Sequence, residues 1–345
     1  MHISVRLFGI VSVFSFFSMS CADWTWLYKK RFSKKQIFEN RSKKNVVFEK
    51  RGVPAFSQLV FSWNAFRPKK GHFSFFAQAY NPRTKAWGPW HKMMEWGKKV
   101  QRSYYAKQQG NSKYVYVRLE ADKKNLANGF RIKISAQEGA SLGLLRGFSV
   151  CTADFTKFKS QTITKNILNL PSVYVRGVPK KSQMALDHPR IKHLCSPTSC
   201  SMLTSFLSRK KVDPLEFAKS VFDCGLDTYG SWPFNVAHAF ERCRGNYFFS
   251  IVRLHSFENL HRQLRRRIPI VVSVRGHLKG APKVYDNGHL LVVVGWDAKR
   301  KQVICHDSAL EVDEKTLKRY DIQSFLSGWE RSHRLAYFAE PNILG

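Results

Sequence analysis

Two hydrophobic patterns divide the chain. From residue 55 to about residue 155, short runs rich in aromatic and β-branched residues alternate with turn signals. The runs read PAFSQLVFSWNAF, GHFSFFAQAY, SKYVYVRLEA and FRIKISAQ, and the turn signals are Asn81-Pro82, Gly88-Pro89 and Gly110-Asn111. Short strands between regular turns are typical of an all-β sandwich. We therefore assign residues 51–160 to a β-sandwich domain.

The second pattern begins near residue 171 and continues to residue 345. Helical periodicity and helix-start signals come first, and apolar strand-like runs follow. The predicted helices cover residues 197–207, 214–224, 232–243 and 256–266, and the strands cover 268–274, 289–296, 301–307 and 334–340. Helices followed by consecutive strands predict an α+β domain with an antiparallel sheet.

The β-rich segment is unusually aromatic, and two uses of its rings stay open. Rings could pack the core between the sheets, or they could form a face on which a glycan stacks. Core packing is the favoured interpretation. The rings are Trp63, Trp87, Trp90, Trp96, Tyr80 and Tyr105.

The N-terminus has the pattern of an export signal. An apolar run over residues 7–20 follows a weakly positive start, so residues 1–22 are predicted to be a signal peptide. Cleavage would follow Ala22, or Cys21 would become the lipidated end of a lipoprotein. We expect a periplasmic, cell-surface or secreted protein. No later run reaches the ~18 apolar residues of a membrane span.

The formal net charge is +34, with a dense basic stretch between Lys29 and Arg51. We interpret residues 23–50 as a basic connector. Such a charge favours an anionic envelope surface, lipid or glycan, as a partner. The chain has no zinc-finger spacing, ribonucleoprotein motif or phosphate-binding glycine loop, so a specific nucleic-acid partner is not expected.

The chain has seven cysteines, an odd number, so at least one thiol has no cysteine partner within the chain. Cys224 and Cys243 could bridge two predicted helices in an oxidising compartment. No Cys-x-x-Cys or His-x-x-x-His spacing is present, so neither a metal nor another cofactor is expected.

The stretch HLCSPTSCSML, residues 193–203, contains a candidate nucleophilic cysteine, Cys195. Ser196 is a favoured N-cap and Pro197 suits a first helical turn. Cys195 would then lie at a helix N-terminus, where unpaired N–H groups and the helix dipole favour a thiolate. The alternative is a buried structural cysteine.

A thiolate nucleophile needs a base, and the base needs a group that orients it. His289 begins an apolar strand after Gly288, and the next strand ends at Asp307. A three-residue turn centred on Ala298 would place His289 directly opposite Asp307 on the same face of a hairpin. A two-residue turn would place Ser308 there instead.

Three motifs occur in this order: Cys195-Ser-Pro-Thr-Ser, Gly288-His289 and His306-Asp307-Ser308-Ala309. Through them the chain resembles papain-fold cysteine peptidases related to bacteriocin-processing (double-glycine leader) peptidases. The resemblance covers about residues 175–341. It implies a Cys195 nucleophile, a His289 base and an orienting Asp307. It also implies an oxyanion-hole glutamine, for which Gln183 is the matching position, although it lies further upstream than is usual.

The segment from Phe56 to Trp96, with Ser62-Trp63-Asn64-Ala65, resembles the accessory domain of some exported relatives. The resemblance implies a peptidase or amidohydrolase that cleaves a peptide or protein substrate through a thioester. Acyl transfer or deamidation by the same triad is an alternative. Another is a non-catalytic protein that binds the envelope surface through its basic, aromatic β-domain.

Overall fold

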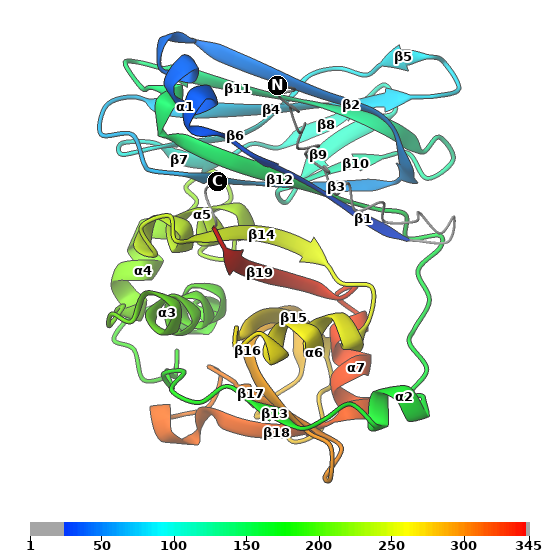
Figure 1. Cartoon of the computed structure of the whole chain (residues 1–345), viewed down its shortest axis with the longest axis vertical. Helices are drawn as coiled ribbons and strands as arrows, with labels where there is room; N and C mark the ends of the chain where they lie inside the picture. Colours follow the sequence, from blue (N-terminus) through cyan, green and yellow to red (C-terminus); the bar gives the residue numbers. More distant parts are fainter. Residues whose placement is uncertain (1–23, 343–345) are drawn as a thin grey trace, which may run out of the picture.

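The computed structural model describes residues 24–342. Two β-sheets are stacked face to face in the N-terminal half, and a mixed unit of helices and one sheet lies beside them (Figure 1). We call these the sandwich domain and the C-terminal domain. The predicted signal peptide, residues 1–22 with Cys21, lies outside the described residues.

The sandwich domain contains two sheets whose pairings are all antiparallel. The first sheet has the order β1 (Thr25–Arg31), β12 (Leu145–Ala153), β3 (Gln58–Ala65), β10 (Arg118–Ala121), β9 (Ser112–Val115) and β8 (Ala106–Gln109). The second has the order β2 (Asn45–Phe56), β11 (Ala127–Gln137), β4 (His72–Asn81), β6 (His91–Gly97) and β7 (Gln101–Ser103), with β5 (Ala86–Trp87) paired to β4.

Aromatic rings fill much of the sandwich core. Trp63 and Trp96 are fully buried, with ring centroids 5.5 Å apart, and Phe75 lies 4.3 Å from Trp63. Core packing therefore accounts for these two tryptophans. By contrast Trp87 is half-buried and Tyr105 is exposed, so these rings are not part of that core.

The interpretation of residues 23–50 as a connector is wrong. β1 pairs with β12 from Thr25 to Arg31, and β2 begins at Asn45, with the short helix α1 (Lys34–Glu39) between them. Trp26 and Tyr28 lie two residues apart on one face of β1, and their stacked rings contact the core. Lys29 and Arg31 lie on the other face of the strand, where both pair with Glu340 of the C-terminal domain, so the positive charge of this segment did not indicate a connector.

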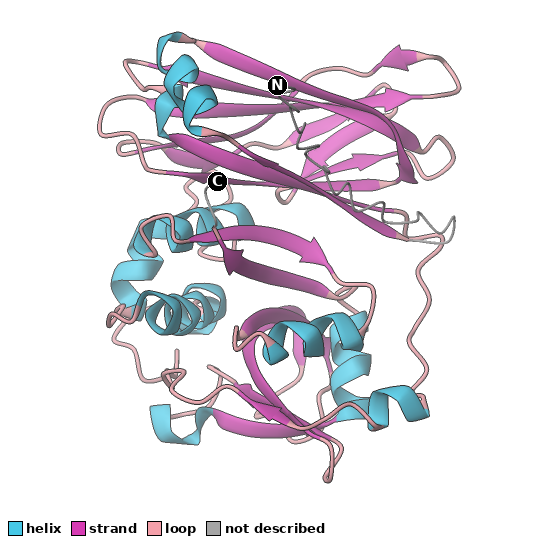
Figure 2. Ribbon diagram, viewed as in Figure 1, coloured by secondary structure: helices cyan, strands magenta, loops and turns pink. Residues whose placement is uncertain are grey.

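The C-terminal domain is built on one antiparallel sheet, with helices on its faces (Figure 2). The sheet has the order β14 (Tyr247–Arg253), β19 (Leu335–Pro341), β15 (Ile270–Gly276), β16 (Tyr285–Asp297), β17 (Gln302–His306) and β18 (Leu317–Asp321), with β13 (Val173–Tyr174) paired to β16. The helices are α2 (Lys165–Leu168), α3 (Cys195–Ser208), α4 (Pro214–Val221), α5 (Trp232–Arg242), α6 (Phe257–Arg265) and α7 (Ile322–Glu330). The predicted α+β class with an antiparallel sheet, preceded by an all-β sandwich, is confirmed.

Buried polar side chains of β3 join the two domains. Asn64 donates to the carbonyl oxygen of Phe249 and accepts from its backbone N–H, each at 2.8 Å. The Ser62 hydroxyl accepts from the backbone N–H of Ile251 at 3.3 Å. Because these bonds are buried and directional, they fix the position of β14 against the sandwich.

The six cysteines of the described part are all free. The bridge between Cys224 and Cys243 is therefore absent, since Cys224 is exposed after α4 while Cys243 is buried at the end of α5. No helix within residues 24–342 combines the length and the apolar character that a membrane span requires.

Candidate active site

Cys195 is the first residue of α3, and its side chain is half-buried. The expected N-cap is wrong: Leu194 occupies the cap, and Ser196 lies inside the helix with its hydroxyl 2.9 Å from that of Tyr337. Cys195 thus lies in the first turn, where backbone N–H groups lack intrahelical partners and stabilise negative charge. Cys200, further along α3, is buried, and burial raises the pKa of its thiol well above the usual value.

His289 extends from β16 and is buried beside Cys195. Its register partner on β15 is Val274. The ring of Tyr285 stacks on the imidazole, with centroids 4.2 Å apart and an interplanar angle of 16°. Gly288, immediately before it, has a φ of +86°, a conformation that a side chain would strain. The local backbone and the stacked ring together fix the orientation of the imidazole.

Asp307 follows the end of β17 and is fully buried. Its Oδ1 lies 2.8 Å from His289 Nε2 and accepts from the backbone N–H of Ala309 at 2.9 Å. Its Oδ2 accepts from the hydroxyls of Tyr285 and Tyr320 at 2.7 and 2.6 Å. Every donor around this carboxylate therefore stabilises its charged form.

The contact between His289 and Asp307 forms in a register that differs from the expected one. Asp297 pairs with Gln302, so the hairpin loop has four residues, and a bulge follows Val293. Val292 consequently lies opposite His306, and His289 does not lie directly opposite Asp307. The two side chains share a face of the sheet and meet diagonally, within the reach of long side chains across neighbouring strands.

The electrostatics favour a thiolate–imidazolium pair. Burial acts to raise the pKa of Cys195, but a hydrogen bond and charge from His289 outweigh it and lower that pKa. Burial acts to lower the pKa of His289, but the charge and hydrogen bond of Asp307, with Cys195, raise it to about 9. The pKa of Asp307 falls to about 2 despite its burial, chiefly through His289. At neutral pH the site therefore holds a nucleophile and a proton donor in contact.

Gln183 is buried near this group and is held by three hydrogen bonds. Its backbone N–H donates to the carbonyl of Ser308 at 2.8 Å, and its Oε1 accepts from the Ser308 hydroxyl at 2.9 Å. Its Nε2 donates to the carbonyl of Ile191 at 2.8 Å, in the turn that precedes Cys195. An amide nitrogen has two hydrogens, so Nε2 keeps one for a further acceptor.

Two tyrosines of the site were missed from sequence. Tyr285 lies four residues before His289, and Tyr320 lies in a strand that the hydrophobic pattern did not reveal. Their buried hydroxyls face the Asp307 charge, and burial together with that charge raises the pKa of both. They remain protonated donors at any physiological pH. Within residues 24–342 no group of three or more His, Cys, Asp or Glu side chains could hold a metal ion.

Replacing Tyr320 with phenylalanine should lower kcat/KM about tenfold, because Asp307 Oδ2 loses one of its two hydroxyl donors. The free energy of unfolding should fall by about 1–2 kcal/mol. Steady-state kinetics and thermal melting measure the two effects. Tyr114→Phe is the matched control, since that buried hydroxyl has no hydrogen-bond partner within the described residues. Equal effects of the two variants on kcat/KM would contradict the positioning role of Tyr320.

Comparison with known proteins locates the match in the C-terminal domain. Residues 175–337 match the Peptidase_C39 like family. Among solved structures, a protein described as a C39-like peptidase from Bacillus anthracis is 15% identical, with 50% of this chain and 99% of that chain covered and a TM-score of 0.38. Xylellain, a cysteine protease from Xylella fastidiosa, is 12% identical, with 53% and 91% covered and a TM-score of 0.31. No curated protein matches the chain.

Proposed function

Because residues 175–337 belong to the C39-like family of cysteine peptidases, we propose that this chain hydrolyses a peptide bond with Cys195 as nucleophile, His289 as acid and base, and Asp307 as the positioning residue. The substrate is a peptide or a protein. The sandwich domain is an accessory part of the same enzyme.

The reaction proceeds through a thioester. The Cys195 thiolate attacks the carbonyl carbon, and the negative oxygen accepts from the backbone N–H of Cys195 and from the remaining hydrogen of Gln183 Nε2. His289 gives its proton to the leaving amine as the C–N bond breaks. The neutral imidazole then takes a proton from water, whose oxygen attacks the thioester, and the thiolate leaves. Asp307 keeps the imidazole oriented throughout.

The observation that supports this proposal is the set of buried hydrogen bonds on Asp307. A buried carboxylate is unfavourable unless its oxygens are fully bonded, and four donors converge on this one. One of these donors is His289, which also bonds Cys195. A protein that only binds a surface has no need for this arrangement, so we favour an enzyme over the non-catalytic alternative.

Export stays a prediction, because it depends on residues 1–22. We propose hydrolysis among the reactions open to the same triad. Acyl transfer would differ from it only in the acceptor, and deamidation would differ only in the amide that is attacked.

The test is digestion of a proteome-derived peptide library in water enriched in ¹⁸O. We expect new C-termini that each carry one ¹⁸O atom, detected by mass spectrometry. Alkylation of the enzyme with iodoacetamide before digestion should prevent them. Glutamine residues converted to glutamate without chain cleavage would indicate deamidation, and amine-capped new C-termini would indicate acyl transfer. Cleavage that survives alkylation would contradict a thiol mechanism.

A further inference from the structure

A cleft of about 750 Å³ separates the sandwich domain from the C-terminal domain. On the sandwich side it is lined by the hairpin β9–β10 and the residues that follow it. On the other side it is lined by the first residue of α5, by β15, by β16 and by the loop after α7. The lining includes Asn287 and Gly288, which immediately precede His289. The cleft therefore borders the part of β16 that leads into His289, at the boundary between the domains.

The charges in this cleft are almost all positive. Glu120 is its one carboxylate, and that group is 3.7 Å from Arg118. The cations that line the cleft are Arg118, Lys123, Arg253, Arg275 and Arg331. Within residues 24–342, none of these except Arg118 forms an ion pair with a carboxylate.

These cations converge from both domains. Burial lowers the pKa of Arg118, and the positive charge of Arg275 on β15, which lines the same cleft, lowers it further. His333 lies in the same cleft, and burial followed by Arg253, Arg118 and Lys123 lowers its pKa to about 4. Like charges held together in a partly enclosed space create a positive potential that attracts an anion.

The hairpin that borders the cleft is strained at its tip. Tyr116 and Val117 form its two-residue loop and have φ values of +45° and +59°. Such loops favour Asn-Gly, and a β-branched residue in this conformation is disfavoured. Tyr116 is 64% exposed at the cleft. The Arg118 guanidinium, which follows, lies over the ring of Trp232 at 5.7 Å, across the domain boundary.

We propose that this cleft is a subsite for a carboxylate of the peptide substrate, close to the scissile bond, with Arg118 and Lys123 of the sandwich domain and Arg275 of the C-terminal domain as its specificity residues. The proposal rests on the proposed peptidase function. It assigns the accessory domain a direct part in substrate selection, because its residues form one wall of the cleft. Acidic peptides should be cleaved in preference to neutral ones of the same shape.

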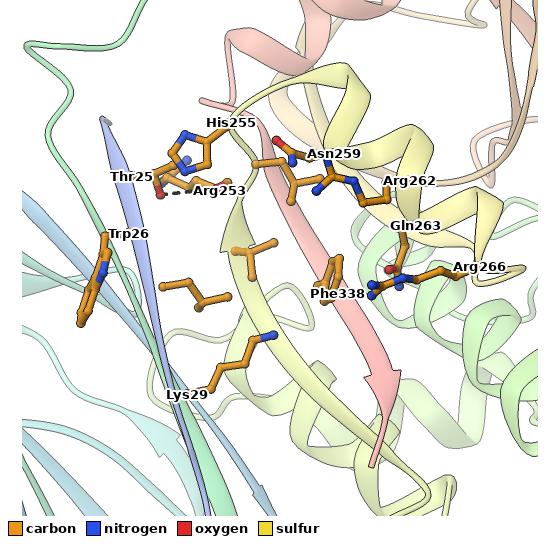
Figure 3. A pocket seen from close by; sticks show the side chains of 13 residues that line it. Thr25, Trp26, Lys29, Arg253, His255, Asn259, Arg262, Gln263, Arg266 and Phe338 are labelled. Atoms are coloured by element: carbon orange, nitrogen blue, oxygen red, sulfur yellow. Dashed lines mark hydrogen bonds between the residues drawn. The ribbon is translucent and has the colours of Figure 1, made fainter. Parts of the chain in front are cut away.

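A second basic cavity provides the control. It has a volume of about 220 Å³ and lies between β1, β14, β19 and α6, where the side chains of Arg262 and Arg266 extend from the helix (Figure 3). Its lining contains neither Asn287 nor Gly288. Both arginines are exposed, as are Lys123 and Arg275 in the cleft. Reversing either pair of charges therefore changes the net charge equally, but only Lys123 and Arg275 line the cleft that contains Asn287 and Gly288.

The experiment compares Lys123→Glu/Arg275→Glu with Arg262→Glu/Arg266→Glu and the wild type. Sequences cleaved in the library are resynthesised as pairs that differ only by Glu or Gln at each position near the cut. One set has amidated C-termini and the other has free ones. We expect the wild type and the control variant to prefer the acidic peptide about tenfold in kcat/KM. The preference should vanish or reverse in the cleft variant, while the control variant cleaves both Glu and Gln peptides near the wild-type rate.

The two peptide sets identify the source of the carboxylate. A preference in the amidated set supports a side-chain carboxylate, and one confined to the free set supports the terminal carboxylate. Equal cleavage of Glu and Gln peptides by the wild type, in both sets, would overturn the subsite while leaving the peptidase function in place. Equal loss of preference in both variants would also overturn it, because a general charge effect would then suffice. No alkylation-sensitive cleavage of any peptide would contradict the peptidase function itself.

Discussion

Replacing Cys195 with alanine should lower kcat/KM for peptide cleavage by at least about 10⁴-fold, because the nucleophile is removed from a group that acts as a unit. The fold should persist. Cys195 is half-buried at the start of α3, and loss of one sulfur there should change the free energy of unfolding by less than about 1 kcal/mol. Initial rates with a cleaved library peptide and thermal melting by circular dichroism measure both effects.

Cys224→Ala is the matched control, because this cysteine is free and exposed in the loop after α4. It should keep the wild-type rate. Cleavage by Cys195→Ala at more than about one hundredth of the wild-type rate would mean that another group is the nucleophile. If the melting temperatures of both variants were far below that of the wild type, the loss of activity would reflect unfolding and not the loss of the nucleophile.

The parts of the site that follow from local sequence could be predicted. Pro197 suits the first turn of a helix, although Leu194 and not Ser196 is the N-cap, and the apolar run after His289 predicts a buried strand. The order of the three candidate residues then suggested the family, and the matched residues 175–337 confirm that recognition.

The parts that depend on contacts distant in sequence could not be predicted. Tyr320 reaches Asp307 only because β18 pairs with β17, and LKRYD, the sequence of β18, has no clear apolar alternation. β1 belongs to the sandwich because Trp26 and Tyr28 face its core, although three of its seven residues are basic. The register prediction failed because the hairpin loop has four residues and a bulge lies between Val293 and Gly295.

The cleft is lined by residues of both domains, and no sequence pattern within one domain could indicate it. Arg118 of the sandwich and Arg275 of the C-terminal domain line one cleft, and the hydrogen bonds of Asn64 with Phe249 hold the two domains together. The basic composition alone predicts affinity for an anionic surface. We propose a narrower use of the same charge, the selection of an acidic substrate by the cations of the cleft beside Gly288.

Replacing Asp307 with alanine should have the second large effect, a fall of about 10²–10⁴-fold in kcat/KM. Four buried donors lose their acceptor, and the charge that raises the pKa of His289 disappears. The free energy of unfolding should fall by about 3 kcal/mol or more, because buried donors left unpaired are unfavourable. Asp307→Asn separates these effects, since the amide keeps the shape and one oxygen but not the charge.

The pH profile of Asp307→Asn distinguishes a positioning role from a structural one. In the wild type, His289 must hold its proton to protonate the leaving amine, so activity should be present below its pKa of about 9 and be lost as the pH rises through that value. Without the Asp307 charge that pKa falls, so the alkaline limb of kcat/KM should move to lower pH. Values of kcat/KM from initial rates between pH 5 and 10 test this, with Tyr114→Phe as the reference for an alkaline limb that does not shift. An alkaline limb at the same pH in Asp307→Asn and the wild type would contradict the assignment of Asp307, even if the variant were slower.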